Sequence, residues 1–523
     1  MTAQTQTITQ TSSRPLSFAA WLTLERAAWL GILLLAAAIR FIGLGAHPLE
    51  PFEAQTAWAA WRISQGLSLN QATLKGLSPL LLGGQVVLFF LVGASDALAR
   101  FWPALAGTVL VLLPYGLCRQ LGRGGALAAG LLLALSATTT YFSRHADGAV
   151  LAVAAGTSLL VVLIRPARIG GERGRLIWAG IAAVLVLLAD IPVAWWPQLG
   201  SDAGRPPFYW PLWHLLLDDP LVAVVGVAGA VVAWRRRDRL GVILTVWAGV
   251  ALLVGMLLPA RRTVEHLYAV VPLALLAGPA VARFLVDVWE RLRFQWVEAA
   301  LLGLASLALL VTLGIWLTDY SRLGEAQFLM AALVPFLFVA IVPLAYGFWV
   351  GWEVTGRIMG LVALVVLLLL TINFSWALSL DTDVYRHPAL LPATTTYGPR
   401  LLQRELRKLS SQRLGDPRDL VVDVQVEADS PLLRWYLRDF RGVRYVGGLD
   451  PATAGIAVIT PLRESVPLGE AYSGDRIPLT AIFSPAELRG ANLVRWLLYR
   501  RWEGDMAQNE VVLWVKQESA TQK

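Results

Sequence analysis

The sequence predicts a multi-span α-helical membrane protein that carries a C-terminal α/β domain. Composition is the first observation: 56% of the 523 residues are hydrophobic, only 15% are charged, and mean hydropathy is +0.59. A soluble domain has roughly 25% charged residues, so this chain is too apolar to be a soluble globule. The net charge of +8 therefore does not indicate a nucleic-acid-binding protein, and basic loops on one side of a membrane explain it better.

The distribution of charge is the second observation, and it divides the chain into regions. Residues 379–523 contain 37 of the 80 charged residues, whereas the much longer stretch 1–378 contains 43. In the C-terminal part 19 basic residues nearly balance 18 acidic ones, so the positive excess lies before residue 379. We expect a disordered cytoplasmic N-terminus at 1–26, a transmembrane domain at 27–378 and a soluble domain at 379–523.

Apolar runs long enough to cross the hydrocarbon core of a bilayer, which takes about 20 residues, recur along the transmembrane domain. We expect eleven membrane-spanning helices, near 27–45, 101–118, 124–142, 147–164, 176–195, 218–234, 240–259, 267–288, 296–317, 326–349 and 357–378.

A twelfth apolar run, at 77–92, is ambiguous, and the charges of the loops decide how it is interpreted. If it does not cross, fourteen loop cations lie on one side of the membrane and seven on the other. The positive-inside rule makes the first side cytoplasmic. The sequence thus predicts a juxtamembrane helix at 77–92, a cytoplasmic N-terminus and an extracytoplasmic C-terminal domain, in a multi-pass protein of the plasma (inner) membrane.

The first predicted outer loop, which begins at His47, contains two carboxylates, Glu50 and Glu53. After Pro51 the residue pattern predicts an amphipathic interfacial helix with Glu53 in its first turn, where a negative charge is favourable. Two interpretations follow. Glu53 is either a charge that stabilises a helix end, or a general base within hydrogen-bond reach of an acceptor hydroxyl or amine.

The histidines do not predict a metal site. His47, His145, His214 and His266 fall in or beside outer loops that also carry carboxylates. None of them has tight ligand spacing such as His-x-x-x-His. We therefore expect neither a metal nor another cofactor, with a divalent cation as the less favoured alternative.

The region after residue 381 changes from continuous apolar runs to short alternating elements, typical of a compact α/β domain. No nucleophile constellation, phosphate loop or metal motif appears in it, so a binding or lid role is expected. The predicted helices are 397–410 and 431–440, and the predicted strands are 419–425, 455–460 and 511–515.

Several short stretches, in order over about the first 290 residues, resemble the GT-C membrane glycosyltransferases. They are Arg40-Phe-Ile-Gly-Leu before the acidic loop, Ser78-Pro79-Leu-Leu-Leu, Val92-Gly-Ala-Ser-Asp96-Ala-Leu-Ala-Arg100-Phe-Trp-Pro103 and Tyr141-Phe-Ser-Arg144-His-Ala-Asp147. Within the superfamily the chain is most similar to the protein O-mannosyltransferase and aminoarabinose transferase group (glycosyltransferase family 39-like). Members of that group use polyprenyl-phosphate sugars and often carry an extracytoplasmic C-terminal domain.

This resemblance implies an inverting transfer of a sugar from a polyprenyl-phosphate donor to a glycan, lipid or protein acceptor on the non-cytoplasmic face. In the group the first outer loop carries an Asp-Glu pair, whereas here the matching residues are Phe52-Glu53. The resemblance makes Glu53 the expected catalytic carboxylate, which deprotonates or orients the acceptor. Glu50 is a substitute for the missing aspartate, and Asp147 is a further acidic partner. The missing aspartate keeps an alternative open: a catalytically degenerate subunit or scaffold of a membrane complex.

Cations near the outer surface are expected to bind the lipid phosphate through charge-assisted hydrogen bonds. Lys75, the only lysine before residue 378, precedes Ser78-Pro79 and is the first candidate. The alternatives are a solvated loop charge for Lys75 and snorkelling to headgroups for the two basic residues before the span at 267–288. The predicted phosphate-binding residues are Lys75, Arg144, Arg261, Arg262 and His266.

Overall fold

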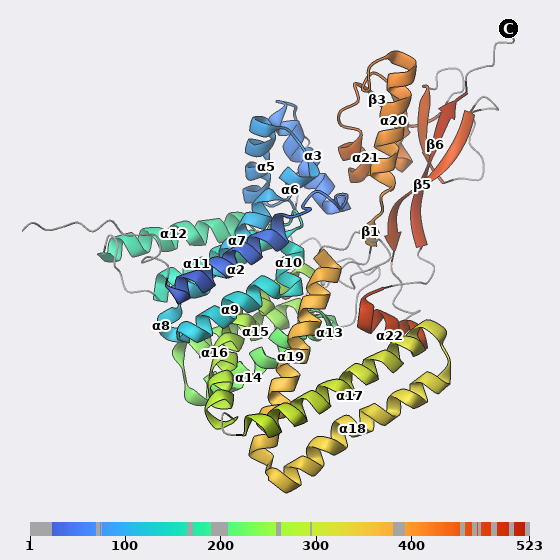
Figure 1. Ribbon diagram of the computed structural model, residues 1–523. Helices are drawn as coiled ribbons and strands as arrows, with labels where there is room; N and C mark the ends of the chain where they lie inside the picture. The colour runs from blue at the N-terminus through green and yellow to red at the C-terminus, as the bar shows by residue number, and fades with distance from the viewer. Residues whose placement is uncertain are drawn as a thin grey trace, which may run out of the picture.

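The computed structural model consists of a large body of packed helices with a sheet-containing domain at one end (Figure 1). Within the helical body, the first outer loop lies on the side of the sheet domain. The predicted disordered N-terminus falls almost wholly outside the described part. The structure describes residues 23–517 except 70–73, 75, 165–170, 190–207, 258–262, 293–294, 380–392, 450–454, 463–467, 469–471, 483–488 and 502–506.

A helix occupies each position at which the sequence predicts a membrane span. Among the described residues, five helices are long and apolar enough to cross a membrane, or up to seven if each of two bent pairs forms one span. The helices are confirmed, whereas the count of eleven spans stays a prediction. The helices are α2 (Leu24–Phe41), α7 (Phe101–Gly116), α9 (Arg123–Leu135) with α10 (Ala137–Ser143), α11 (Ala149–Ile164), α12 (Gly171–Ala189), α14 (Pro220–Arg236), α15 (Arg239–Leu257), α16 (Leu267–Leu292), α17 (Trp296–Leu323), α18 (Ala326–Val350) and α19 (Trp352–Ser379).

Two of the helical segments are sharply bent, and one side chain connects the two bends. Helices α9 and α10 meet at 58°, and α13 (Trp210–Asp218) and α14 meet at 110°. Asp219, at the second bend, accepts hydrogen bonds from the backbone N–H groups of Ala137 (2.9 Å) and Thr138 (3.1 Å) at the start of α10. These N–H groups have no partner within their own helix, so Asp219 stabilises the break in α9–α10.

Glycines allow α9 and α14 to pack closely against α16. A Cβ atom at Gly229 of α14 would lie 2.4 Å from the carbonyl oxygen of Leu276, and one at Gly278 of α16 would lie 2.3 Å from that of Gly125. No side chain fits at these contacts, as is common where membrane helices approach closely. Helix α16 is therefore the central helix of this part of the body.

The outer loop forms three helices that stand beside the C-terminal domain in Figure 1: α3 (Pro51–Ser64), α5 (Pro79–Val92) and α6 (Asp96–Ala99). Helix α5 corresponds to the ambiguous apolar run. Its 14 residues extend over about 21 Å, which is shorter than a hydrocarbon core of about 30 Å. This length agrees with the predicted juxtamembrane helix.

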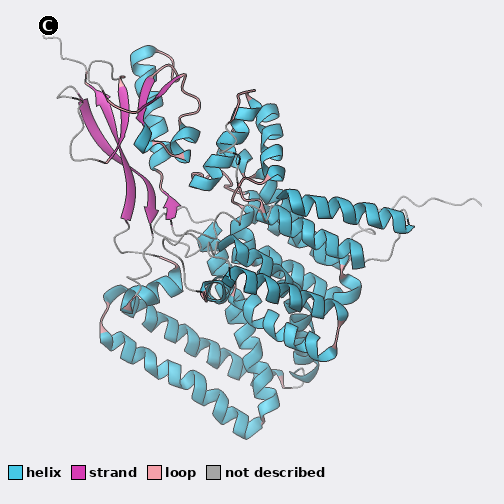
Figure 2. Cartoon of the chain, turned by 180° about the vertical axis from the view of Figure 1, so that it is seen from behind, coloured by secondary structure: helices cyan, strands magenta, loops and turns pink. Residues whose placement is uncertain are grey.

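The C-terminal domain contains a six-stranded mixed sheet with the order β1-β5-β6-β4-β2-β3, whose strands are drawn in magenta in Figure 2. Strand β2 pairs in parallel with β3 and β4, and the other pairs are antiparallel. The predicted helices and strands are present. Its elements are β1 (Ala393–Thr395), α20 (Gly398–Leu414), β2 (Val421–Gln425), α21 (Pro431–Tyr436), β3 (Gly442–Val446), β4 (Ala457–Pro461), β5 (Tyr472–Ile482), α22 (Gly490–Tyr499) and β6 (Ala507–Lys516).

The sequence analysis did not predict strands β1, β3 and β5 or helix α22. Strand β3 lies at the sheet edge, and in β5 four exposed residues follow the buried Tyr472, so neither shows the buried alternation that identifies a strand. Helix α22 leaves the sheet and packs against α17 of the helical body, where Tyr499 bonds Thr318 (oxygen to oxygen, 2.6 Å).

The outer-loop helices and the C-terminal domain share one apolar core. Trp435 of α21 is fully buried, and its ring lies 5.8 Å from that of Phe89 in α5. Beside this core, Asp96 of α6 accepts hydrogen bonds from Trp435 Nε1 (2.8 Å), the Tyr436 hydroxyl (3.0 Å) and Arg400 Nη2 (2.6 Å). The domain is thus fixed against the first outer loop by apolar contact and by one multiply bonded carboxylate.

We expect Asp96→Ala to loosen this contact by about 2–3 kcal/mol, because the buried Trp435 and Tyr436 and the partly buried Arg400 lose their acceptor. Hydrogen exchange of the amides of α21 should become faster, while amides in α16 keep their protection. Asp419→Ala is the matched control, because Asp419 pairs with an exposed arginine and such a pair contributes about 1 kcal/mol or less. Unchanged exchange in α21 of the Asp96 variant would show that apolar contact alone holds the domain.

Candidate functional site

Three arginines from distant segments bind the backbone between α2 and α3. This stretch has no regular secondary structure, and a buried carbonyl oxygen without a donor costs free energy. Arg100, Arg144 and Arg400 supply the donors, at distances of 2.5–3.2 Å, and so fix the conformation of the loop. Arg144 donates to the carbonyls of Ile39, Arg40, Ile42 and Gly43, Arg100 to those of Leu44, His47 and Pro48, and Arg400 to those of Gly45, Ala46 and His47.

Glu53 forms a buried ion pair with Arg100. The two oxygens of Glu53 lie 2.9 Å from Nε and 2.5 Å from Nη2 of Arg100, and each side chain is 3% exposed. Glu53 also accepts the backbone N–H groups of Glu50 (2.8 Å) and Ala146 (2.5 Å). Burial raises the pKa of Glu53, but the charge and hydrogen bonds of Arg100 outweigh it and lower that pKa to about 2. A carboxylate bound by four donors is a weak base.

Glu50 is the more easily titrated carboxyl of the loop. Its Oε2 accepts hydrogen bonds from the backbone N–H (3.1 Å) and the hydroxyl (3.0 Å) of Thr395 in β1. Burial and then the negative charge of Glu53 raise the pKa of Glu50 to about 8, against the smaller opposing effects of Thr395 and Arg100. A group that titrates near neutral pH is suited to general acid–base chemistry.

Two neutral histidines flank these carboxyls. The ring of His145 packs on that of Tyr141 with a centroid distance of 4.0 Å, and its Nδ1 lies 2.8 Å from the Tyr141 carbonyl oxygen. Burial and the nearby arginines lower the pKa of His145 to about 4, although Glu53 acts in the opposite direction, and they lower the pKa of His47 to about 4 as well. At neutral pH both rings are therefore uncharged.

A second polar cluster lies where α22 of the C-terminal domain meets the helical body. Arg500, just after α22, is 1% exposed, and its guanidinium lies over the rings of Phe374 (4.3 Å) and Trp496 (4.4 Å). Its Nη2 donates to the carbonyl oxygen of Leu217 (2.5 Å) and lies 3.7 Å from Oδ1 of Asp218. Within the described part of the chain, Nε and Nη1 of Arg500 have no hydrogen-bond partner. A buried cation with unused donors is a candidate anion-binding group.

Histidines surround the acidic side of this second cluster. Oδ2 of Asp218 lies 2.9 Å from Nδ1 of His214 at 1% exposure of both side chains, and the rings of His214 and His266 are 5.3 Å apart. His266, predicted from the sequence as a phosphate-binding residue, is itself buried here. The structure therefore places it in the cluster around Asp218, whose carboxylate also interacts with Arg500, a residue that the sequence analysis did not select.

Helix α10 connects the two clusters. Its start is bound by Asp219, which adjoins Asp218, and near its end Tyr141 lies within electrostatic range of Glu50, Glu53 and Asp218. The helix has seven residues and a length of about 10 Å. The titratable carboxyl of Glu50 and the buried guanidinium of Arg500 are thus separated by about the length of this short helix. Both lie on the side of the molecule that carries the C-terminal domain.

The other predicted site residues have different surroundings. Lys75, Arg261 and Arg262 lie outside the described residues. Asp147 accepts the backbone N–H of Ala149 (2.8 Å) at the start of α11. Arg144 binds the end of α2, and these contacts support a structural function rather than phosphate binding.

The sequence analysis missed Arg100, Arg400 and Arg500 as residues of the site. Arg100 had a signal, because it is a lone cation beside an apolar run. Arg500 had none, since nothing in the sequence relates it to residues nearly 300 positions away. Among the described residues, no three His, Cys, Asp or Glu side chains are grouped closely enough to hold a metal ion.

The helical body, its bent helices and the attached mixed-sheet domain define a membrane protein with the GT-C fold. Its resemblance to this superfamily is confirmed at the level of the fold by solved structures. The chain is similar to ArnT, an aminoarabinose transferase, from Cupriavidus metallidurans bound to undecaprenyl phosphate, with a TM-score of 0.54 and 14% identity over 93% of this chain and 98% of that chain.

The apo state of the same ArnT matches with the same coverage, 14% identity and a TM-score of 0.51. The oligosaccharyltransferase of Archaeoglobus fulgidus, tethered with an acceptor peptide, matches over 92% of this chain and 74% of that one, with 10% identity and a TM-score of 0.49. No family model matches the sequence, and no curated protein matches it significantly.

We expect Arg100→Met to destabilise the protein by about 3–5 kcal/mol, because it leaves Glu53 charged and buried without its partner. Arg441→Met is the control, since Arg441 pairs with an acid at the exposed surface and its loss changes stability by about 1 kcal/mol or less. Denaturant unfolding in detergent measures both changes. Equal stability of the two variants would contradict the structural role assigned to the Glu53–Arg100 pair.

Proposed function

We propose that this protein is a glycosyltransferase that moves a sugar from a polyprenyl-phosphate carrier to an acceptor on the non-cytoplasmic face of the membrane. The observation that carries the proposal is the placement of Glu50 and the buried, incompletely bonded Arg500 near opposite ends of α10. The similarity in fold to ArnT, whose structure holds undecaprenyl phosphate, supports the same donor class.

The proposed reaction is a single displacement with inversion at the anomeric carbon. The acceptor oxygen or nitrogen forms a bond to that carbon while the bond to the phosphate oxygen breaks, and the phosphate leaves with the electron pair. The acceptor proton passes to Glu50. Arg500 and His266 stabilise the charge on the leaving phosphate, and Lys75, Arg261 and Arg262 are proposed to bind the same phosphate.

In this proposal the carboxyls of Glu50 and Glu53 have different functions. Glu53 was the first candidate for the base, but its four hydrogen bonds and low pKa suit a group that holds the loop. Glu50, whose pKa is about 8, is the better base. Glu53 then acts through Glu50, because its negative charge keeps the pKa of Glu50 high.

One observation favours the alternative, a non-catalytic subunit. Phe52 stands where the resembled group has an aspartate, and its ring is 38% exposed. In that case the protein binds a lipid phosphate and partner subunits without transferring a sugar. Binding and turnover measured separately distinguish the two functions.

We expect transfer of radiolabelled sugar, from a panel of polyprenyl-phosphate sugars in liposomes, to increase with pH up to about 8. The base must be deprotonated, and Glu50 is protonated below its raised pKa. Glu50→Gln should reduce turnover about 100-fold or more and remove this pH dependence. Glu325→Gln, at an exposed carboxylate, should change neither. A Glu50 variant with wild-type turnover would exclude the assigned base.

We expect Arg500→Met to weaken binding of polyprenyl phosphate about tenfold or more, because a charge-assisted hydrogen bond is lost. Arg501→Met removes the neighbouring, exposed cation and should leave the affinity unchanged. Thermal unfolding confirms that both variants are folded. Tight binding by the wild type without turnover of any donor would favour the non-catalytic subunit, and equal binding by the Arg500 variant would contradict the assigned phosphate site.

A further inference from the structure

A polar cavity lies at the other end of the helical body from the Arg500 cluster. Helix α16 begins at Leu267, directly after His266, and Arg283 lies about 24 Å further along its axis. The cavity at that level has a volume of about 720 Å³. It is therefore well separated from the Arg500 cluster and lies on the side that the positive-inside rule assigns to the cytoplasm.

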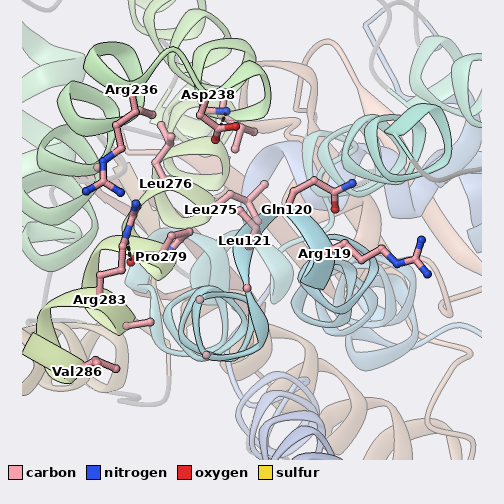
Figure 3. A pocket seen from close by; sticks show the side chains of 18 residues that line it. Arg119, Gln120, Leu121, Arg236, Asp238, Leu275, Leu276, Pro279, Arg283 and Val286 are labelled. Atoms are coloured by element: carbon pink, nitrogen blue, oxygen red, sulfur yellow. Dashed lines mark hydrogen bonds between the residues drawn. The ribbon is translucent and has the colours of Figure 1, made fainter.

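Five helices form the walls of this cavity: α8 (Cys118–Leu121), α9, α14, α15 and α16. Three arginines line it, Arg119, Arg236 and Arg283, with Asp238 as the single acid. Figure 3 shows the side chains of Arg236 and Arg283 extending toward the same side of the cavity from two helices. The carboxylate of Asp238 is bound to the backbone N–H of Gly241 (3.1 Å) at the start of α15.

The arginine side chains that line this cavity form few hydrogen bonds or ion pairs with the described part of the chain. Nε of Arg283 donates to the carbonyl oxygen of Pro279 (3.0 Å). In the part of the chain that the structure describes, the side chains of Arg119 and Arg236 form no hydrogen bond or ion pair. Arg236 and Arg283 extend toward the same side of the cavity (Figure 3), and the one acid of its lining, Asp238, balances only part of their charge. A bound anion relieves the remaining repulsion.

The rest of the cavity lining is mostly apolar and consists mainly of leucines and glycines. Leu244, Leu275 and Leu276 line it together with several glycines. A Cβ atom at Gly124 would meet only the Cβ of Ala282, at an ordinary contact distance of 3.5 Å, so the space beside Gly124 is open. Cations beside an apolar lining match a ligand that joins a phosphate to a hydrocarbon chain.

We propose that this cavity binds the phosphate headgroup of an anionic phospholipid from the leaflet opposite the C-terminal domain. Basic pockets between membrane helices on the cytoplasmic side recognise such headgroups. A free phosphate ester offers the same anion without the hydrocarbon chain, so the two sources are separated by experiment. The inference rests on the cavity alone and is independent of the proposed transferase function.

Native mass spectrometry of the purified full-length protein in detergent tests the proposal with phosphatidylglycerol and phosphatidylcholine as probes. We expect the wild type to bind phosphatidylglycerol about tenfold more tightly. Arg236→Gln should abolish that preference. Arg235→Gln removes the adjacent exposed charge, which does not line the cavity, and should preserve it.

A second variant tests the space rather than the charge. Gly124→Leu keeps every arginine but fills the cavity beside Ala282, so it should also abolish the preference for phosphatidylglycerol. Equal losses in the Arg235 and Arg236 variants, or no preference in the wild type, would overturn the proposal because general surface charge would then explain lipid binding. Displacement of the lipid by an equal concentration of glycerol phosphate would overturn the lipid as occupant and identify a soluble phosphate ester.

Discussion

The buried ion pair between Glu53 and Arg100 is the interaction on which the half of the molecule next to the C-terminal domain depends. It connects the start of α3 to the segment before α7, and Glu53 adds a bond to the backbone that follows α10. The remaining donors of Arg100 bind carbonyls of the loop after α2. A buried ion pair contributes little net stability but is expensive to break. Its main effect is therefore to allow one conformation of the loop that presents Glu50 to the C-terminal domain.

The same pair also determines the chemistry of the loop. Because Arg100 is bound to Glu53, its charge does little to neutralise Glu50, and burial with the charge of Glu53 raises the pKa of Glu50. The two carboxyls lie three residues apart in the sequence, yet the pKa of Glu53 is lowered by Arg100 while the pKa of Glu50 is raised by burial and by the charge of Glu53. Separation of this kind is how neighbouring acids take different roles in one site. It also gives a physical reason why a chain with Phe52 in place of an aspartate retains a titratable group there.

The sequence predicted features that depend on local pattern. The length of apolar runs located the membrane helices, and the spacing after Pro51 located α3 with Glu53 in its first turn. The number of crossings was less accessible, because the bend at Ser136 divides a helix that the apolar run at 124–142 presents as continuous. The sequence did not indicate which distant residues contact one another. Glu53 and Arg100 are 47 residues apart. Helix α22, which places Arg500 against the helical body, follows a stretch of strands.

The central claim is that Arg500 and His266 form the binding site for a lipid phosphate, about the length of the short helix α10 away from Glu50. The most direct measurement is an electron cryomicroscopy structure of the protein in lipid nanodiscs with a polyprenyl phosphate. The account predicts phosphate density within hydrogen-bond distance of Arg500 Nε or Nη1, with the chain of the lipid leaving toward the membrane. Phosphate density away from Arg500, with both of its nitrogens still unbonded in the complex, would contradict it.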